Sequence, residues 1–105
     1  MNKAEKFRFE DQIAYTENGI VSKQIVKSKT GNVTLFAFDK DQFLSEHTAP
    51  FDALIQVIEG ETKVSIDGIW YELTAGESII LPANIPHAVN ALSPFKMVLT
   101  MIKES

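Results

Sequence analysis

Two histidines, His47 and His87, are the residues of this chain best suited to chemistry, and each adjoins an apolar, β-rich run. A neutral imidazole offers one donor and one acceptor nitrogen near pH 7, and it is also a common metal ligand. A histidine pair can therefore contact a polar organic ligand or hold a divalent metal ion. The chain contains no cysteine, which excludes disulfides and thiolate metal sites.

Other reaction classes lack the residues that they need. Ser45 and Ser78 have no histidine and aspartate at a spacing typical of a catalytic triad, and there is no glycine-rich phosphate loop. The 14 acidic and 10 basic residues are interspersed and give a net charge of −4, without a basic stripe. This pattern disfavours nucleic acids and anionic membranes as partners.

The chain also lacks the apolar segments that direct proteins to membranes. No apolar run approaches the roughly 18 residues of a membrane span. The N-terminal sequence MNKAEKFRFEDQ has no apolar stretch typical of a secretory signal. We therefore expect a soluble, cytoplasmic protein without a membrane partner.

The histidines must be positioned by short strands, because no segment repeats its apolar residues at the helical period of about 3.6. With 105 residues the chain is long enough for one domain. We expect an N-terminal segment at 1–10, either a helical turn or frayed, and a β-barrel domain at 11–105. Regularly spaced short strands predict an all-β sandwich or barrel. The expected strands are 20–27, 33–38, 42–44, 52–58, 62–66, 69–73, 78–81, 87–91 and 95–102.

The strongest local signal is the pair Asp67-Gly68, which lies between two apolar runs. An Asp-Gly pair in this setting suits a two-residue type I′ hairpin, in which both central residues have positive φ. We therefore expect 62–66 and 69–73 to pair as a hairpin.

Two of the expected strands contain runs, 53–58 and 97–102, that carry apolar residues at both parities. A half-exposed antiparallel strand should alternate between apolar and polar residues, so these strands are expected to be covered on both faces. In a chain without helices, a second copy of the protein is the expected cover, which predicts a homodimer. The alternative is that a few apolar side chains are simply exposed, as is common.

The segments from His47 to Gly60 and from Gly76 to Ala91 resemble the two sequence motifs of the cupins. The first motif places His-x-His before a Glu and then a Gly, and the second places Gly, Pro-x-Gly, His and Asn in that order. Together with the residues between them, the two motifs extend from His47 to Ala91, a little under half of the chain. The resemblance implies a double-stranded β-helix, or jelly-roll, barrel in a single domain.

The match to the first motif is incomplete. His47 stands at the first histidine position, but the second histidine position holds Ala49. The glutamate position, counted back from Gly60, holds Ala53.

The second motif matches better. Gly76, Pro82 and His87 stand at their expected positions. Asn84 replaces a glycine, which suggests a left-handed backbone there because asparagine tolerates it better than most residues. The final asparagine position holds Ala91, and Asn90 stands one residue earlier.

In cupins with the full motif, three histidines and one glutamate hold a divalent metal. Only His47 and His87 remain here, so the resemblance implies at most a weak site for Zn, Ni, Mn or Fe. Weakening even a partner of a metal ligand costs about 10–100-fold in affinity, and losing two direct ligands should cost more than 100-fold. Asp52 and Glu46 neighbour motif positions but point to the opposite face at a period of two, unless a bulge turns one inward.

We therefore expect a small organic ligand between His47 and His87 in an apolar pocket, as is typical of small-molecule sites. Its walls are expected to include Ala49, Ala53, Ile55, Val57 and Met97, although Met97 and its parity-mates can equally be core. The alternative is a metal-dependent oxygenase or isomerase in which water or substrate completes the two-histidine site. We do not expect a conventional cupin metalloenzyme with the full ligand set. The third possibility is a structural dimer whose histidines are relics.

Overall fold

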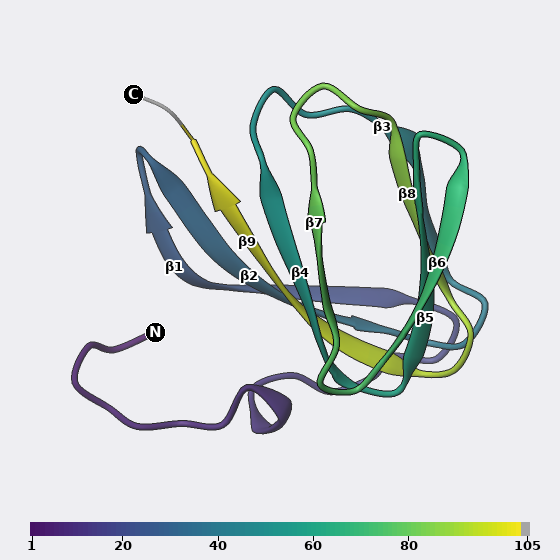
Figure 1. The fold of residues 1–105 in the computed structure, drawn as a ribbon. Helices are drawn as coiled ribbons and strands as arrows, with labels where there is room; N and C mark the ends of the chain where they lie inside the picture. Colours follow the sequence, from purple (N-terminus) through teal and green to yellow (C-terminus); the bar gives the residue numbers. More distant parts are fainter. Residues whose placement is uncertain (104–105) are drawn as a thin grey trace.

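Residues 1–103 of the computed structural model form two facing antiparallel sheets (Figure 1). The elements are the 3-10 turn η1 (Phe9–Asp11) and the strands β1 (Ile20–Ser28), β2 (Gly31–Phe38), β3 (Phe43–His47), β4 (Ala53–Glu59), β5 (Glu61–Ile66), β6 (Ile69–Thr74), β7 (Ser78–Leu81), β8 (His87–Ala91) and β9 (Phe95–Ile102). One sheet has the order β1-β2-β9-β4-β7, and the other has the order β3-β8-β5-β6. The prediction of an all-β fold is confirmed.

The observed strands lie close to the expected ones. Those predicted at 78–81, 87–91 and 95–102 have the same bounds in the structure. The largest difference concerns the strand predicted at 42–44, because β3 runs on to His47. His47 is therefore the last residue of a strand rather than part of a loop, and its position is set by pairing with β8.

The turn residues adopt the backbone conformations that their types predicted. Asp67 and Gly68 have φ of 52° and 80°, and they join β5 to β6 as expected of a type I′ hairpin. Asn84 has φ of 62° in the loop between β7 and β8. The left-handed backbone inferred for the asparagine that replaces a glycine is therefore present.

One end of the space between the sheets is closed by large apolar side chains. Phe38 and Phe95 stack there with ring centroids 4.6 Å apart. Val57 and Met97 pack in the same cluster, and both are buried. The histidines lie at the opposite end, where β3 ends and β4 begins (Figure 1). We call this the open end, because His47 is exposed there.

The outer face of the five-stranded sheet is partly covered by the chain's own N-terminal strap, residues 9–15. Ile13 packs there in a second apolar cluster with Leu35, Ala37 and Val98. Val98 is one of the apolar residues for which a second protein copy was expected as cover. Since the strap already buries Val98, the presence of apolar residues on both faces of β9 does not by itself require a dimer.

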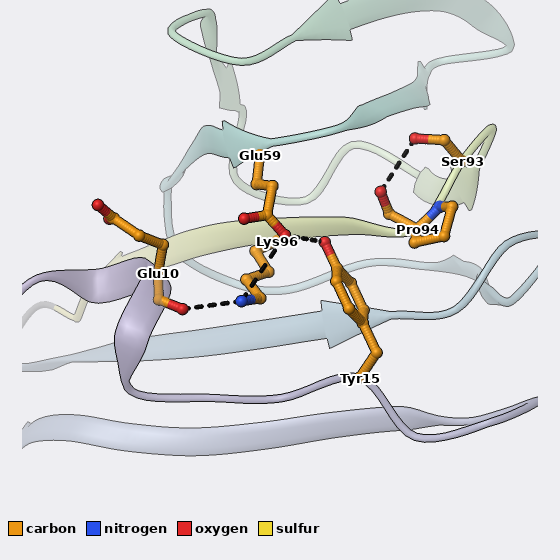
Figure 2. Close-up of polar contacts among 6 residues, drawn as sticks. All are labelled: Glu10, Tyr15, Glu59, Ser93, Pro94 and Lys96. Atoms are coloured by element: carbon orange, nitrogen blue, oxygen red, sulfur yellow. Dashed lines mark hydrogen bonds and ion pairs between the residues drawn. The ribbon is translucent and has the colours of Figure 1, made fainter.

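Polar contacts around Lys96 fasten the strap to the sheet (Figure 2). The Lys96 ammonium donates to the Glu10 carbonyl at 2.7 Å and lies 3.6 Å from the Glu59 carboxylate. The Tyr15 hydroxyl donates a short hydrogen bond to the same carboxylate. Burial and Glu59 together raise the pKa of Tyr15 well above its ordinary value, so the phenol stays protonated.

Part of the outer face remains uncovered beyond the strap. Leu54 is half-buried, whereas Ile80 and Ile102 are 61% and 66% exposed around a shallow apolar hollow of about 230 Å³. Within residues 1–103, no helix is long and apolar enough to span a membrane.

Candidate functional site

The structure brings the two histidines together at the open end of the barrel. His47 ends β3 and His87 begins β8, and the two residues are paired across the strands. Their Nε2 atoms lie 3.1 Å apart, and the ring centroids are separated by 4.4 Å. His87 is only 6% exposed, whereas His47 faces solvent. The two residues come from distant positions, and strand pairing alone makes them neighbours.

Each imidazole is oriented by a backbone carbonyl. Nδ1 of His47 lies 2.8 Å from the Ser45 carbonyl oxygen, and Nδ1 of His87 lies 3.2 Å from that of Ile85. A carbonyl oxygen only accepts, so each Nδ1 carries the proton and each neutral ring has a bare Nε2. Two bare nitrogens then face each other at hydrogen-bond distance. Such a pair is satisfied only by a shared proton, a cation or a hydrogen-bond donor placed between or beside the rings.

The surroundings of His87 disfavour a proton on its ring. Burial lowers the pKa of His87, and the neighbouring His47 lowers it further, although the hydrogen bond to Ile85 acts in the opposite direction. The neutral form of His87 is therefore favoured.

The geometry of the pair fits two positions of a metal site but not a whole one. With metal–nitrogen bonds of about 2.0–2.1 Å, nitrogens 3.1 Å apart subtend about 95–100° at the ion, as two adjacent ligands do. Catalytic zinc sites use three protein ligands and structural ones use four. Within residues 1–103, no group of three or more His, Cys, Asp or Glu side chains could hold an ion. The donor set therefore does not fit a resident metal.

The two carboxylates considered from the sequence do not complete this set. Asp52 accepts a hydrogen bond from the Ala83 backbone N–H at 2.8 Å, which occupies one of its oxygens in the loop between β7 and β8. Glu46 is exposed in β3 beside His47. The alternative in which a bulge brings either carboxylate to the imidazoles is not present in this structure.

The expected wall residues lie at different depths. Ala49 is half-buried, and its carbonyl accepts from the Asn84 N–H at 2.7 Å, which ties the two loops beside the histidines together. Ala53 is buried at the open end of β4. Ile55, Val57 and Met97 lie deeper in the main apolar cluster, where Ile55 is 0% exposed. Val57 and Met97 therefore lie toward the closed end, away from the histidines.

Two polar residues that the sequence did not single out lie on the inner face of β2. Asn32 and Thr34 share the parity of Phe36 and Phe38, which pack in the cluster between the sheets. The sequence signal for them was that these two polar residues share an alternation of two with the aromatic residues later in the same strand. This signal could not show which face of the strand points between the sheets, because the alternate residues, Leu35 among them, are equally apolar.

Comparisons with known proteins agree with this architecture. The model of the family described as "Cupin domain" matches residues 34–103. A conserved protein of unknown function from Streptococcus pyogenes is 28% identical, with a TM-score of 0.94 over 100% of this chain and 92% of its own. A cupin superfamily protein from Desulfitobacterium hafniense is 22% identical, with a TM-score of 0.92 over 99% of this chain and 95% of its own.

A third structure is more similar in sequence but longer. The "Cupin 2 conserved barrel domain protein" from Leptotrichia buccalis is 43% identical, with a TM-score of 0.89. The match covers 92% of this chain and 47% of that one. A search of curated proteins finds no match. The predicted jelly-roll barrel is confirmed by these comparisons.

Proposed function

The chain belongs to the cupin family, and from this premise we propose that it binds a small organic molecule at the open end of its barrel. His47 and His87 are the polar contacts in this proposal. The observation that carries it is that the two Nε2 atoms lie 3.1 Å apart while each Nδ1 lies within hydrogen-bond distance of a backbone carbonyl, which leaves each neutral ring with an Nε2 that can only accept. A ligand hydroxyl that donates to this pair would satisfy it.

The surroundings of the pair support a ligand with an apolar body. Ala49 and Ala53 present methyl groups where a histidine and a glutamate stand in the full cupin motif. Ile66 is the strand neighbour of His87 in β5, and it is half-buried in the main apolar cluster. Ile55, Val57 and Met97 continue this apolar interior toward the closed end. Apolar walls with a few convergent polar groups are typical of small-molecule sites.

The test is NMR of the histidine rings in the untagged protein, with a panel of small alcohols, amides and carboxylic acids added one at a time. We expect saturable shifts of the ring nitrogens of both histidines with at least one alcohol. The same titration on His47→Ala should show no saturable shift at His87. If no compound of the panel moved either ring, the proposal would be wrong.

A metal-dependent enzyme is the second candidate, because the nitrogen separation equals that of two adjacent ligands on one ion. Dialysis of the untagged protein against Zn, Ni, Mn or Fe(II), followed by metal analysis, separates the two candidates. We expect well below one equivalent, because only two ligands are present. Near-stoichiometric metal that is lost in His47→Ala or His87→Ala would favour the enzyme.

We also propose that the protein is a cytoplasmic homodimer, in which the uncovered patch around Ile80 and Ile102 is the contact. Large exposed apolar residues grouped on one sheet face favour an interface over isolated exposure. Light scattering at micromolar concentration is the check. A monomer at that concentration would contradict this part of the proposal.

A further inference from the structure

A row of side chains crosses the whole outer face of the five-stranded sheet, beyond the strap. Strand pairing places one residue from each strand in this outer row, in the order Ile80, Leu54, Thr100, Val33 and Val26. Four of the five are aliphatic, and the two at the ends, Ile80 and Val26, are 61% and 56% exposed. The outward face of an antiparallel sheet normally carries polar residues where water covers it. The outer row therefore indicates a face that packs against another apolar surface.

The two ends of the outer row differ in shape. At the β7 end, Ile80 and the nearby Ile102 are the exposed apolar side chains. At the β1 end, a hollow of about 610 Å³ lies between the sheet and residues 1–9, which run apart from β1 and β2 in Figure 1. Its apolar lining comes from both sides and includes Phe7, Phe9, Ile25, Val26 and Val33. One face of the sheet therefore carries an apolar ridge at one end and an apolar hollow at the other.

The two ends also differ in charge. The lining of the hollow includes two basic residues, Lys3 and Lys27, and one acidic residue, Glu5. The ridge has Asp52 beside it as its charged residue, and Asp52 is exposed. Opposite charges across an interface favour one relative orientation of the partners over others. The face is therefore complementary to itself, in charge as in shape, when it is turned end for end.

A two-fold axis along β9 produces this end-for-end match. β9 is the middle strand in the order β1-β2-β9-β4-β7, so Thr100 is the centre of the outer row. Rotation about such an axis places Ile80 of each copy against the hollow of the other copy. Contacts of this isologous kind are made twice, because the same surface supplies both partners. Facing sheets pack about 10 Å apart, which lets the side chains of the two rows interdigitate.

We propose that the hollow between residues 1–9 and β1–β2 is the docking site for β7 of a second copy, with the outer rows of the two copies packed face to face about β9. Ile80 of each copy then lies against Phe7 and Val26 of the other. This inference rests on the proposed homodimer, because it assigns the surface that receives the patch around Ile80 and Ile102. It also gives residues 1–9 a role in recognition of the second copy.

Crosslinking tests this arrangement directly, because the chain contains no cysteine of its own. Val26→Cys and Ile80→Cys are prepared as separate untagged proteins, mixed and treated with a short bismaleimide, and the products are mapped by mass spectrometry. We expect the mixture to give a crosslink between position 26 of one copy and position 80 of the other. Either protein alone should give little, because equal positions lie about four strand spacings, roughly 19 Å, apart across the axis.

Sedimentation equilibrium tests the two ends of the row separately. Ile80→Asp alters the ridge and Phe7→Ser alters the hollow, and each should weaken dimerisation about tenfold or more, as expected of an apolar anchor in an interface. Both side chains are exposed, so the folded monomer should keep its circular dichroism spectrum. The matched control is Trp70→Asp, since Trp70 is 48% exposed on β6 of the other sheet. The control should leave the dimerisation constant unchanged.

The outcomes distinguish this arrangement from the homodimer on which it rests. A dimer in which Ile80→Cys crosslinks to itself, with no further product in the mixture, would overturn the arrangement about β9 and leave the homodimer standing. The same conclusion would follow if Phe7→Ser dimerised as tightly as the wild type. A dimer weakened by Trp70→Asp and not by Ile80→Asp would place the contact on the other sheet and overturn the inference. A monomer at micromolar concentration would contradict both proposals.

Discussion

Two polar clusters lie on this barrel, and they differ in how completely their atoms are satisfied. Outside the five-stranded sheet, the Lys96 ammonium has the Glu59 carboxylate and the Glu10 carbonyl as partners, and Tyr15 donates to the same carboxylate. Inside the open end, His47 and His87 present two nitrogens of the same kind to each other. The first cluster is complementary in charge and hydrogen bonding, whereas the second has an opening for a further atom.

The difference teaches which cluster holds the fold and which is available for a ligand. A complementary buried cluster stabilises the contacts that it joins, and removing one member leaves the others without partners. A pair of like acceptors gains nothing from its own proximity and is expected to be removable at little cost in stability. The outer cluster should therefore be sensitive in stability, and the inner one in binding.

The largest effect is expected at Lys96, which is buried between the strap and β9. Lys96→Ala should lower the free energy of unfolding by about 2–4 kcal/mol, because Glu59 and the Glu10 carbonyl lose their shared donor. Chemical denaturation measures this. The control Lys40→Ala removes an exposed lysine and should change stability by less than about 0.5 kcal/mol. Equal effects of the two changes would remove the contrast between the clusters.

A gain of comparable size is expected when the inner cluster is completed. Ala49→His combined with Ala53→Glu restores the cupin ligand positions around His47 and His87. The double variant should bind a divalent metal and be stabilised by about 2.7 kcal/mol at a metal concentration 100 times the dissociation constant. Thermal unfolding with and without Zn reports it. A variant that bound no more metal than the wild type would show that the motif positions are wrongly assigned.

A smaller loss is expected for Tyr15→Phe, which removes one hydrogen bond to Glu59 and should cost about 1 kcal/mol. The loss should also depend on pH. The folded state raises the pKa of Tyr15 above its unfolded value near 10, so its contribution is present below about pH 10 and declines as the pH rises further. Urea denaturation at pH 7 and pH 11 compares the variant with the wild type. A difference between them that stayed constant across this range would contradict the assignment.

The smallest effect is expected from the titration of His87. Its pKa is lowered in the folded state, so the unfolded chain binds a proton more readily and stability falls as the pH drops below about 6.5. His87→Gln should flatten this part of the stability profile between pH 7 and pH 5. The urea midpoint is the measurement. The opposite result would be a wild-type urea midpoint that rises between pH 7 and pH 5 while that of the variant does not change. It would mean that His87 binds a proton more readily in the folded state than in the unfolded chain.

The fold could be predicted in some detail because its signals are local. Asp67-Gly68 specified a type I′ turn, Asn84 indicated a left-handed backbone, and three strands were placed at their observed bounds. That His47 and His87 meet was predicted from the resemblance of their segments to the two cupin motifs, not from a local signal. Such predictions succeed because turn chemistry and strand periodicity depend on neighbouring residues.

The site could be predicted only in part. The depth of Ile55, Val57 and Met97 depends on how far Phe38 and Phe95 fill the closed end, and packing between sheets sets this. The strap over Val98 was missed because residues 9–15 show no strong pattern and acquire their position only from contacts across the chain. The cover expected from a second copy was in part supplied by the protein itself.

The sequence by itself determined the strands and their turns, since these follow from residue types and short spacings, whereas the meeting of the two imidazoles was implied only by the resemblance to the cupin motifs. The tertiary structure alone decided that Asn32 and Thr34 point between the sheets, that Lys96 is matched by Glu59, and that no third ligand reaches the histidines within residues 1–103. The physical reason is that a strand has two faces with the same periodicity. Only pairing with distant strands determines which face becomes the inside.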